Sequence, residues 1–87
     1  EVYEMENREG KDATKQTYGE KAVGIDFNPS CLTDIDVMKK KFADVIDKMD
    51  HIRSESTSAE QKRLCSVAIT QIQTAQMWSV KARTWED

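Results

Sequence analysis

The sequence predicts an all-α protein, in which an N-terminal arm and an ordered loop precede an antiparallel hairpin of two long helices. Two observations lead to this prediction. With 3 Gly and 1 Pro in 87 residues, the chain has too few turn residues for a β-sandwich or barrel. Two long segments also carry apolar residues at helical spacing. The length allows one domain, which we divide into an arm at residues 1–17 and a hairpin domain at residues 18–87.

The arm and the loop differ in their apolar content. Residues 1–17 are mostly charged or polar, so we expect either a short helix over residues 2–8 or a mobile arm. Residues 18–30 are punctuated by Gly and Pro and predict an ordered loop. The apolar residues of this loop need burial: Ala22, Val23, Ile25 and Phe27.

The first long helix is predicted to follow the loop. Thr33 has the character of an N-cap, and Asp34 and Asp36 suit the positive end of the helix dipole. Apolar residues then recur three and four positions apart over about 18 residues, which predicts one apolar seam. The seam comprises Ile35, Met38, Phe42, Val45, Met49 and Ile52. The run Lys39–Lys41 is predicted to lie on a solvated face that borders the loop.

The second long helix is predicted over residues 59–83. A capping box precedes it, formed either by Thr57 with Glu60 or by Ser58 with Gln61. The apolar residues of this helix spread over an arc of roughly 200°, wider than one antiparallel partner covers. Either other copies of the chain cover the remainder, or the preceding loop folds over it.

Several residues of the second helix bear on this choice. Trp78 and Trp85 are predicted to be packing residues. Small side chains would allow close approach of a second helix: Ser66, Ala68, Thr70, Ala75 and Ser79.

Composition disfavours several classes of protein. The net charge of −3 is unlike that of a general nucleic-acid binder, which is usually basic. Cys31 and Cys65 form no spacing motif, so two free thiols in a reducing cytosol are the simplest expectation. No apolar run approaches the ~18 residues of a membrane helix, and the acidic, polar N-terminus is unlike a signal peptide.

Signals for catalysis are weak. His51 is the only histidine, and the sequence places no Ser or Cys nucleophile near it. It also has no second His or Cys at ligand spacing, so zinc is not expected. No P-loop, GxGxxG motif or nucleophile elbow is present. We therefore expect a protein that is not an enzyme and binds no metal.

Binding signals gather around Gly19. A tyrosine ring can stack on a nucleobase and a lysine can meet a phosphate, so Tyr18 and Lys21 are candidate ligand-binding residues. The alternative is a structural loop with a solvent-exposed Lys21. Tyr3 in the arm is a further candidate, either stacking on a base or anchoring the arm in a neighbour's groove.

Lys62 and Arg63 lie near the start of the second helix, where a positive charge interacts unfavourably with the helix dipole. Some other interaction is therefore expected to explain cations at these positions. One reason is an anion shared by symmetry-related copies. Around a threefold axis one Arg63 becomes three, which suits a ligand with three phosphates. The alternative is a solvent-exposed Arg63 paired with Glu60.

The segments GEKAVGIDFNPS and KRLCSVAITQIQTAQMWSVKARTW resemble the phage anti-CBASS cyclic-nucleotide sponges, which share a hairpin domain with the sponges that counter Thoeris defence. The resemblance covers roughly residues 18–85. It implies a compact homohexamer of helical hairpins acting in the cytoplasm of the infected host cell. It also implies that the protein binds cyclic di- and trinucleotides, such as cyclic GMP–AMP and cyclic triadenylate. The ligand is sequestered without cleavage and without a cofactor, so that the host effector is starved.

The resemblance further implies roles for single residues. The tyrosine that stacks on bases is Tyr3 or Tyr18, and the lysine of the GEK motif near the dinucleotide is Lys21. The arginine that serves the trinucleotide at the start of the last helix is Arg63.

The alternative function is a small protein-interaction adaptor, whose wide apolar helix binds a partner helix.

Overall fold

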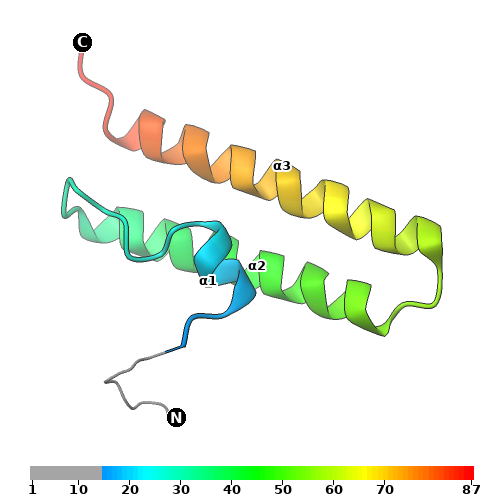
Figure 1. Cartoon of the computed structure of the whole chain (residues 1–87). Coiled ribbons are helices and arrows are strands. Elements are labelled where there is room, and N and C mark those ends of the chain that lie inside the picture. Colours follow the sequence, from blue (N-terminus) through cyan, green and yellow to red (C-terminus); the bar gives the residue numbers. More distant parts are fainter. Residues whose placement is uncertain (1–14) are drawn as a thin grey trace.

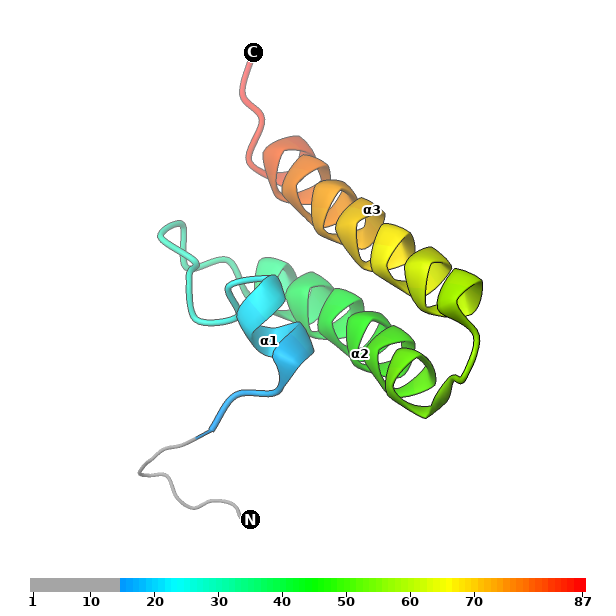
Figure 2. The ribbon, with the colours of Figure 1, turned by 45° about the vertical axis from the view of Figure 1, so that its right-hand side comes forward.

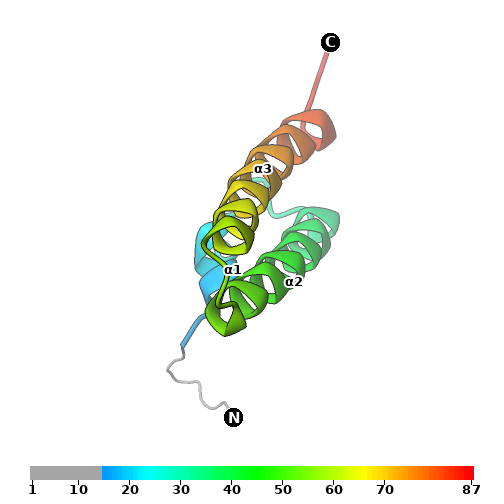
Figure 3. The same ribbon diagram turned by 90° about the vertical axis from the view of Figure 1, so that its right-hand side faces the viewer.

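The protein is all-helical over residues 15–87, the part of the chain that the computed structural model describes. Its helices are α1 (Tyr18–Ala22), α2 (Thr33–Glu55) and α3 (Ala59–Arg83). The two long helices lie side by side and antiparallel, and α1 packs on α2 (Figures 1, 2 and 3). The predicted fold class is therefore confirmed, with α3 at its predicted bounds.

The segment predicted as a loop begins with a helical turn, α1. Thr17 is its N-cap: its hydroxyl accepts a hydrogen bond from the Glu20 N–H at 3.1 Å. The Glu20 carboxylate in turn accepts from the Thr17 N–H at 2.8 Å, which completes a capping box. The prediction missed this helix because the two nearby glycines lower helix propensity, whereas the Thr-x-x-Glu spacing was the signal that favoured it.

Gly19 brings α1 against the backbone of α2. It is buried, and a Cβ added to it would overlap the carbonyl oxygen of Ala43. Its N–H donates to Asp47 Oδ1 at 2.7 Å. Only a residue without a side chain lets α1 approach the backbone of α2 this closely. A hydrogen bond from Gln73 Nε2 to the Ala22 carbonyl, at 3.3 Å, connects the end of α1 to α3.

The core lies where the three helices meet. Its buried members are Val23, Ala43, Ile46 and Ile69. Partly buried apolar residues surround them: Ala22, Ile25, Phe42, Met49 and Ile72. The seam prediction was correct for Ile35, which is 1% exposed, but wrong for Val45, which is 48% exposed. Because α1 packs on α2 beside α3, the buried stripe of α2 is turned toward α1 and includes Ala43 and Ile46 instead.

The starts of the two long helices differ in how they are capped. Thr33 is not the N-cap of α2: the N-cap is Leu32, which has no side-chain cap. Asn28 of the loop closes this helix start instead, because its amide donates to the Leu32 carbonyl at 2.8 Å and to Asp36 Oδ1 at 3.0 Å. At α3, Ser58 is the N-cap, and its hydroxyl accepts a hydrogen bond from the Gln61 N–H at 3.1 Å. Of the two predicted capping pairs, the structure therefore contains Ser58 with Gln61.

Within residues 15–87, no element covers the outward face of α3. Trp78 and Trp85, predicted to be packing residues, are 63% and 66% exposed. The described part of the loop packs over the start of α2 and does not cover this face (Figure 1). Both cysteines are free, with Cys31 exposed and Cys65 buried. Within residues 15–87, no helix has the length and apolarity needed to cross a bilayer.

Substitution of Gly19 by Ala tests the contact between α1 and α2. In an ordinary helix this change stabilises by about 0.5–1 kcal/mol. Here the new methyl group overlaps Ala43, so we expect the free energy of unfolding to fall by about 1–3 kcal/mol. Urea denaturation followed by circular dichroism at fixed protein concentration measures the change.

Lys21→Ala, on the exposed side of the same short helix, is the control and should shift stability by less than about 0.5 kcal/mol. A Gly19→Ala protein more stable than the wild type would contradict the close contact.

Candidate functional site

The outward side of α1 brings two predicted site residues together. Tyr18 and Lys21 are three positions apart in the helix and so lie on one side of it. The Tyr18 side chain is 47% exposed and Lys21 is exposed, whereas Gly19 on the opposite side is buried. A ring and an ammonium group therefore share one surface. Tyr3, the other predicted stacking residue, lies outside the described residues.

Arg53 near the end of α2 belongs to the same surface and was missed by the sequence analysis. Its guanidinium carbon lies 5.5 Å from the centroid of the Tyr18 ring, within reach of a cation–π interaction. Its Nη2 donates to Asp50 Oδ1 at 2.7 Å, and its Nη1 donates to Ser66 Oγ on α3 at 3.0 Å. The hydrogen bond to Asp50, followed by the contact with Tyr18, raises the pKa of Arg53. Its sequence position gave no signal, because an arginine in the last turn already suits the helix dipole.

Arg63, the third predicted site residue within the described part of the chain, lies in the first turns of α3. Its Nε and Nη2 donate to the two carboxylate oxygens of Glu60 at 3.0 and 2.7 Å. This bidentate pair raises the pKa of Arg63 and lowers the pKa of Glu60. Both side chains are exposed. Among residues 15–87 no hydrogen bond or ion pair joins Arg63 to Tyr18 or Lys21. In the single chain Arg63 thus has the solvent-exposed pairing that was the alternative prediction.

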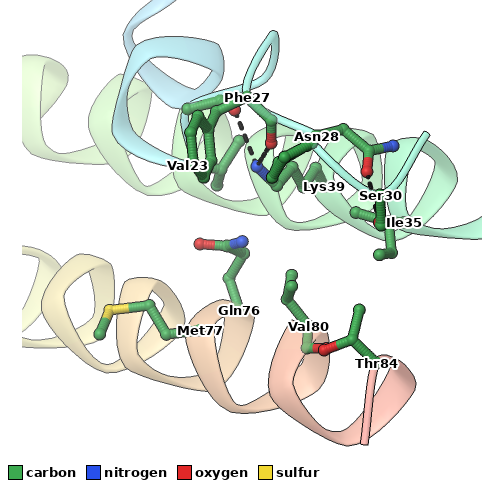
Figure 4. Close-up of a pocket in the computed structure, with 12 residues that line it drawn as sticks. Val23, Phe27, Asn28, Ser30, Ile35, Lys39, Gln76, Met77, Val80 and Thr84 are labelled. Carbon is green, nitrogen blue, oxygen red and sulfur yellow. Dashed lines mark hydrogen bonds between the residues drawn. The ribbon is translucent and has the colours of Figure 1, made fainter. Parts of the chain in front are cut away.

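A cavity of about 490 Å³ opens at the other end of the hairpin, between the loop, the start of α2 and the end of α3 (Figure 4). Phe27 lines it from the loop, Lys39 from α2, and Gln76 and Met77 from α3. Gln76 is 7% exposed and its amide points across the gap toward the loop in Figure 4. The wall is otherwise largely apolar.

Lys39 fastens the loop to α2 at this cavity. It was predicted to lie on a solvated face, but it is 3% exposed. Its ammonium donates to the Gly24 carbonyl at 2.9 Å and to the Phe27 carbonyl, and it lies 5.4 Å from the Phe27 ring centroid. Backbone carbonyls can compensate a buried ammonium, which a residue-type pattern does not reveal. Because this loop connects α1 to α2, Lys39 also helps to position the surface that carries Tyr18.

His51 is exposed, near the end of α2. No group of three His, Cys, Asp or Glu side chains that could hold a metal ion gathers within residues 15–87.

A family model described as "Acb2/Tad1, hairpin domain" matches residues 20–84. The chain belongs to the Acb2/Tad1 hairpin family. This is the family of phage anti-CBASS and anti-Thoeris sponge proteins, which are binding proteins rather than enzymes. The match confirms the resemblance and includes both Lys21 and Arg63, while Tyr18 lies just before it. No curated protein and no solved structure matches the chain.

Substitution of Lys39 by Met tests how the loop of this hairpin domain is held. Methionine keeps the apolar stem but leaves the two loop carbonyls without their donor. We expect the free energy of unfolding to fall by about 1.5–3 kcal/mol. The Ile25 and Phe27 amides, which bond to Glu20 and Gly24 within the loop, should exchange at least about tenfold faster.

Amide hydrogen exchange by NMR measures this loss, with the exposed Lys41→Met as the control on the same helix. Equal exchange rates in the wild type and Lys39→Met would contradict the fastening role.

Proposed function

We propose that this protein binds cyclic di- and trinucleotide immune second messengers, such as cyclic GMP–AMP and cyclic triadenylate, and sequesters them without cleavage. The effect is to block CBASS signalling in the cytoplasm of the infected host cell. The observation that carries the proposal is the family match over residues 20–84, which contains the hairpin and both candidate cations.

The outward side of α1 supports the dinucleotide site. The half-exposed ring of Tyr18 offers a stacking surface, and Arg53 beside it keeps a positive charge close to that ring. Lys21 adds a second cation on the same side of α1, placed to meet a phosphate. Tyr3 is the other tyrosine proposed to stack on a base. These local cations oppose the long-range repulsion between the net −3 chain and an anionic ligand.

Arg63 supports the trinucleotide site. We propose that the chain forms a homohexamer in which three copies of Arg63 meet around a threefold axis and face the three phosphates of one ligand. A phosphate then takes the place of Glu60 on each guanidinium. The bidentate geometry that Arg63 shows toward Glu60 is the geometry that it would use toward a phosphate.

Isothermal titration calorimetry with cyclic GMP–AMP and with cyclic triadenylate tests this function, followed by chromatography of the recovered ligand. We expect both to bind and both to return intact. A linear nucleotide among the recovered products would contradict sequestration, and failure of both ligands to bind would contradict the function itself.

Lys21→Ala should weaken cyclic GMP–AMP binding by about 10- to 100-fold, the loss expected for one charge-assisted hydrogen bond. Lys48→Ala, an exposed lysine on α2, is the matched control and should bind like the wild type. Unchanged affinity of Lys21→Ala would remove this lysine from the dinucleotide site.

Arg63→Ala should abolish cyclic triadenylate binding and leave cyclic GMP–AMP binding unchanged, because the two sites are separate. Glu60→Gln should tighten triadenylate binding by less than about tenfold, since the ligand no longer displaces a carboxylate and exposed ion pairs are weak. Lys62→Ala is the control at the neighbouring position. Parallel loss of both ligands in Arg63→Ala would mean that the two sites are one.

A further inference from the structure

The cavity of about 490 Å³ beside the loop has the composition of a small-molecule site and takes no part in the proposed function. Its volume lies in the range of about 300–1,000 Å³ that is typical of such sites. None of the residues Tyr18, Lys21, Arg53 and Arg63 lines it. Buried side chains from the loop and from both long helices form its floor, and exposed apolar side chains form its rim.

Gln76 places a buried amide in this floor. It is 7% exposed, and the amide points from α3 across the gap toward the loop (Figure 4). This amide has no hydrogen-bond partner among residues 15–87, and Figure 4 draws none to it. Burial of an amide without a partner costs free energy, so buried polar groups in folded proteins are normally hydrogen-bonded. A ligand in the cavity would supply the missing partner.

Lys39 adds a positive charge to the same cavity. An ammonium group has three N–H donors, and two of them are used by the Gly24 and Phe27 carbonyls. Lys39 is the only charged residue that lines the cavity. It is buried, yet none of the ion pairs formed within the described part of the chain includes it. A buried cation without a counter-ion favours an anionic ligand.

The rest of the wall is apolar and suits a hydrocarbon body. Val23 and Ile35 are buried in the floor, whereas Phe27 and Met77 are exposed at the rim. Phe27 belongs to the loop and Met77 to α3, so they lie on opposite sides of the gap (Figure 4). An apolar ligand between them would remove both side chains from water, which is favourable.

We propose that this cavity binds a small carboxylic acid with an apolar body, such as a medium-chain fatty acid. The carboxylate accepts hydrogen bonds from the third N–H of Lys39 and from the Gln76 amide, and the body lies against Phe27, Met77 and Val80. Two donors suit a carboxylate better than a phosphate, whose additional oxygen and charge need further donors. The site rests neither on nucleotide binding nor on assembly.

An NMR titration of the full chain with octanoate, 1-octanol and octylamine tests the site, because these probes share one hydrocarbon chain and differ in the charge of the head group. Octanoate should bind at least about tenfold more tightly than octanol, the factor expected for a charge-assisted hydrogen bond. The octylammonium ion should bind most weakly, because Lys39 repels it. Hexanoate, which is two methylenes shorter, should bind roughly tenfold more weakly than octanoate.

The position of the NMR shifts distinguishes the cavity from other apolar surfaces. The side-chain amide of Gln76 and the methyl groups of Val80 should shift on binding, whereas the backbone amide of the exposed Leu64, near the other end of α3, should not. No shift at Gln76 and Val80 with about 5 mM octanoate would overturn the proposal. Octanol that binds as tightly as octanoate, or equal shifts at Leu64 and Val80, would overturn it as well.

Gln76→Leu tests the contact with the head group. Leucine fills a similar volume without an amide, so we expect octanoate affinity to fall about tenfold and octanol affinity to stay within about threefold of the wild type. Gln61→Leu, at an exposed glutamine in the first turn of the same helix, is the matched control and should bind both probes like the wild type. Parallel changes in both affinities would contradict the contact between the carboxylate and Gln76. Because no nucleotide is added, these results are independent of the proposed function.

Discussion

The close contact between Gly19 and the backbone of α2 determines where the candidate dinucleotide surface lies. A short helix such as α1 has too few hydrogen bonds to persist alone, so its position depends on tertiary contacts. The missing side chain at Gly19 allows the approach, and Asp47 accepts its N–H. Lys39 secures the other end of the segment by bonding to two loop carbonyls. Together these contacts place the ring of Tyr18 next to Arg53, which comes from 35 residues further along the chain.

The long helices were predictable from sequence because their apolar spacing and capping signals agree. The bounds of α3 follow from Ser58 and from the pattern behind it. The side of α2 that is buried was harder to predict, because a seam counted along one helix assumes a single partner. The packing of α1 on α2 adds a second partner, so that Ile46 is buried in the core and Val45, which the seam predicted to be buried, is exposed. Burial of Lys39 depends on carbonyl groups whose direction only the folded loop determines.

The candidate site was predictable in part. Tyr18, Lys21 and Arg63 were candidates from the residues themselves, and the resemblance then gave each of them a role. Arg53 could not be found, since its partners lie on three different helices. The two candidate sites also differ in how complete they are within one chain. Tyr18, Lys21 and Arg53 already gather on one hairpin, whereas Arg63 is held by Glu60, and the trinucleotide site proposed for it needs other copies. The proposed trinucleotide site therefore depends on assembly.

Native mass spectrometry of the full chain with cyclic GMP–AMP tests the proposed function most directly, because it reports the assembly and the bound mass in one spectrum. We predict a homohexamer that carries several molecules of the cyclic dinucleotide at their intact mass. A monomer without bound nucleotide would contradict both the assembly and the binding function. A hexamer that releases the linear, hydrolysed product would contradict sequestration and would make the protein an enzyme.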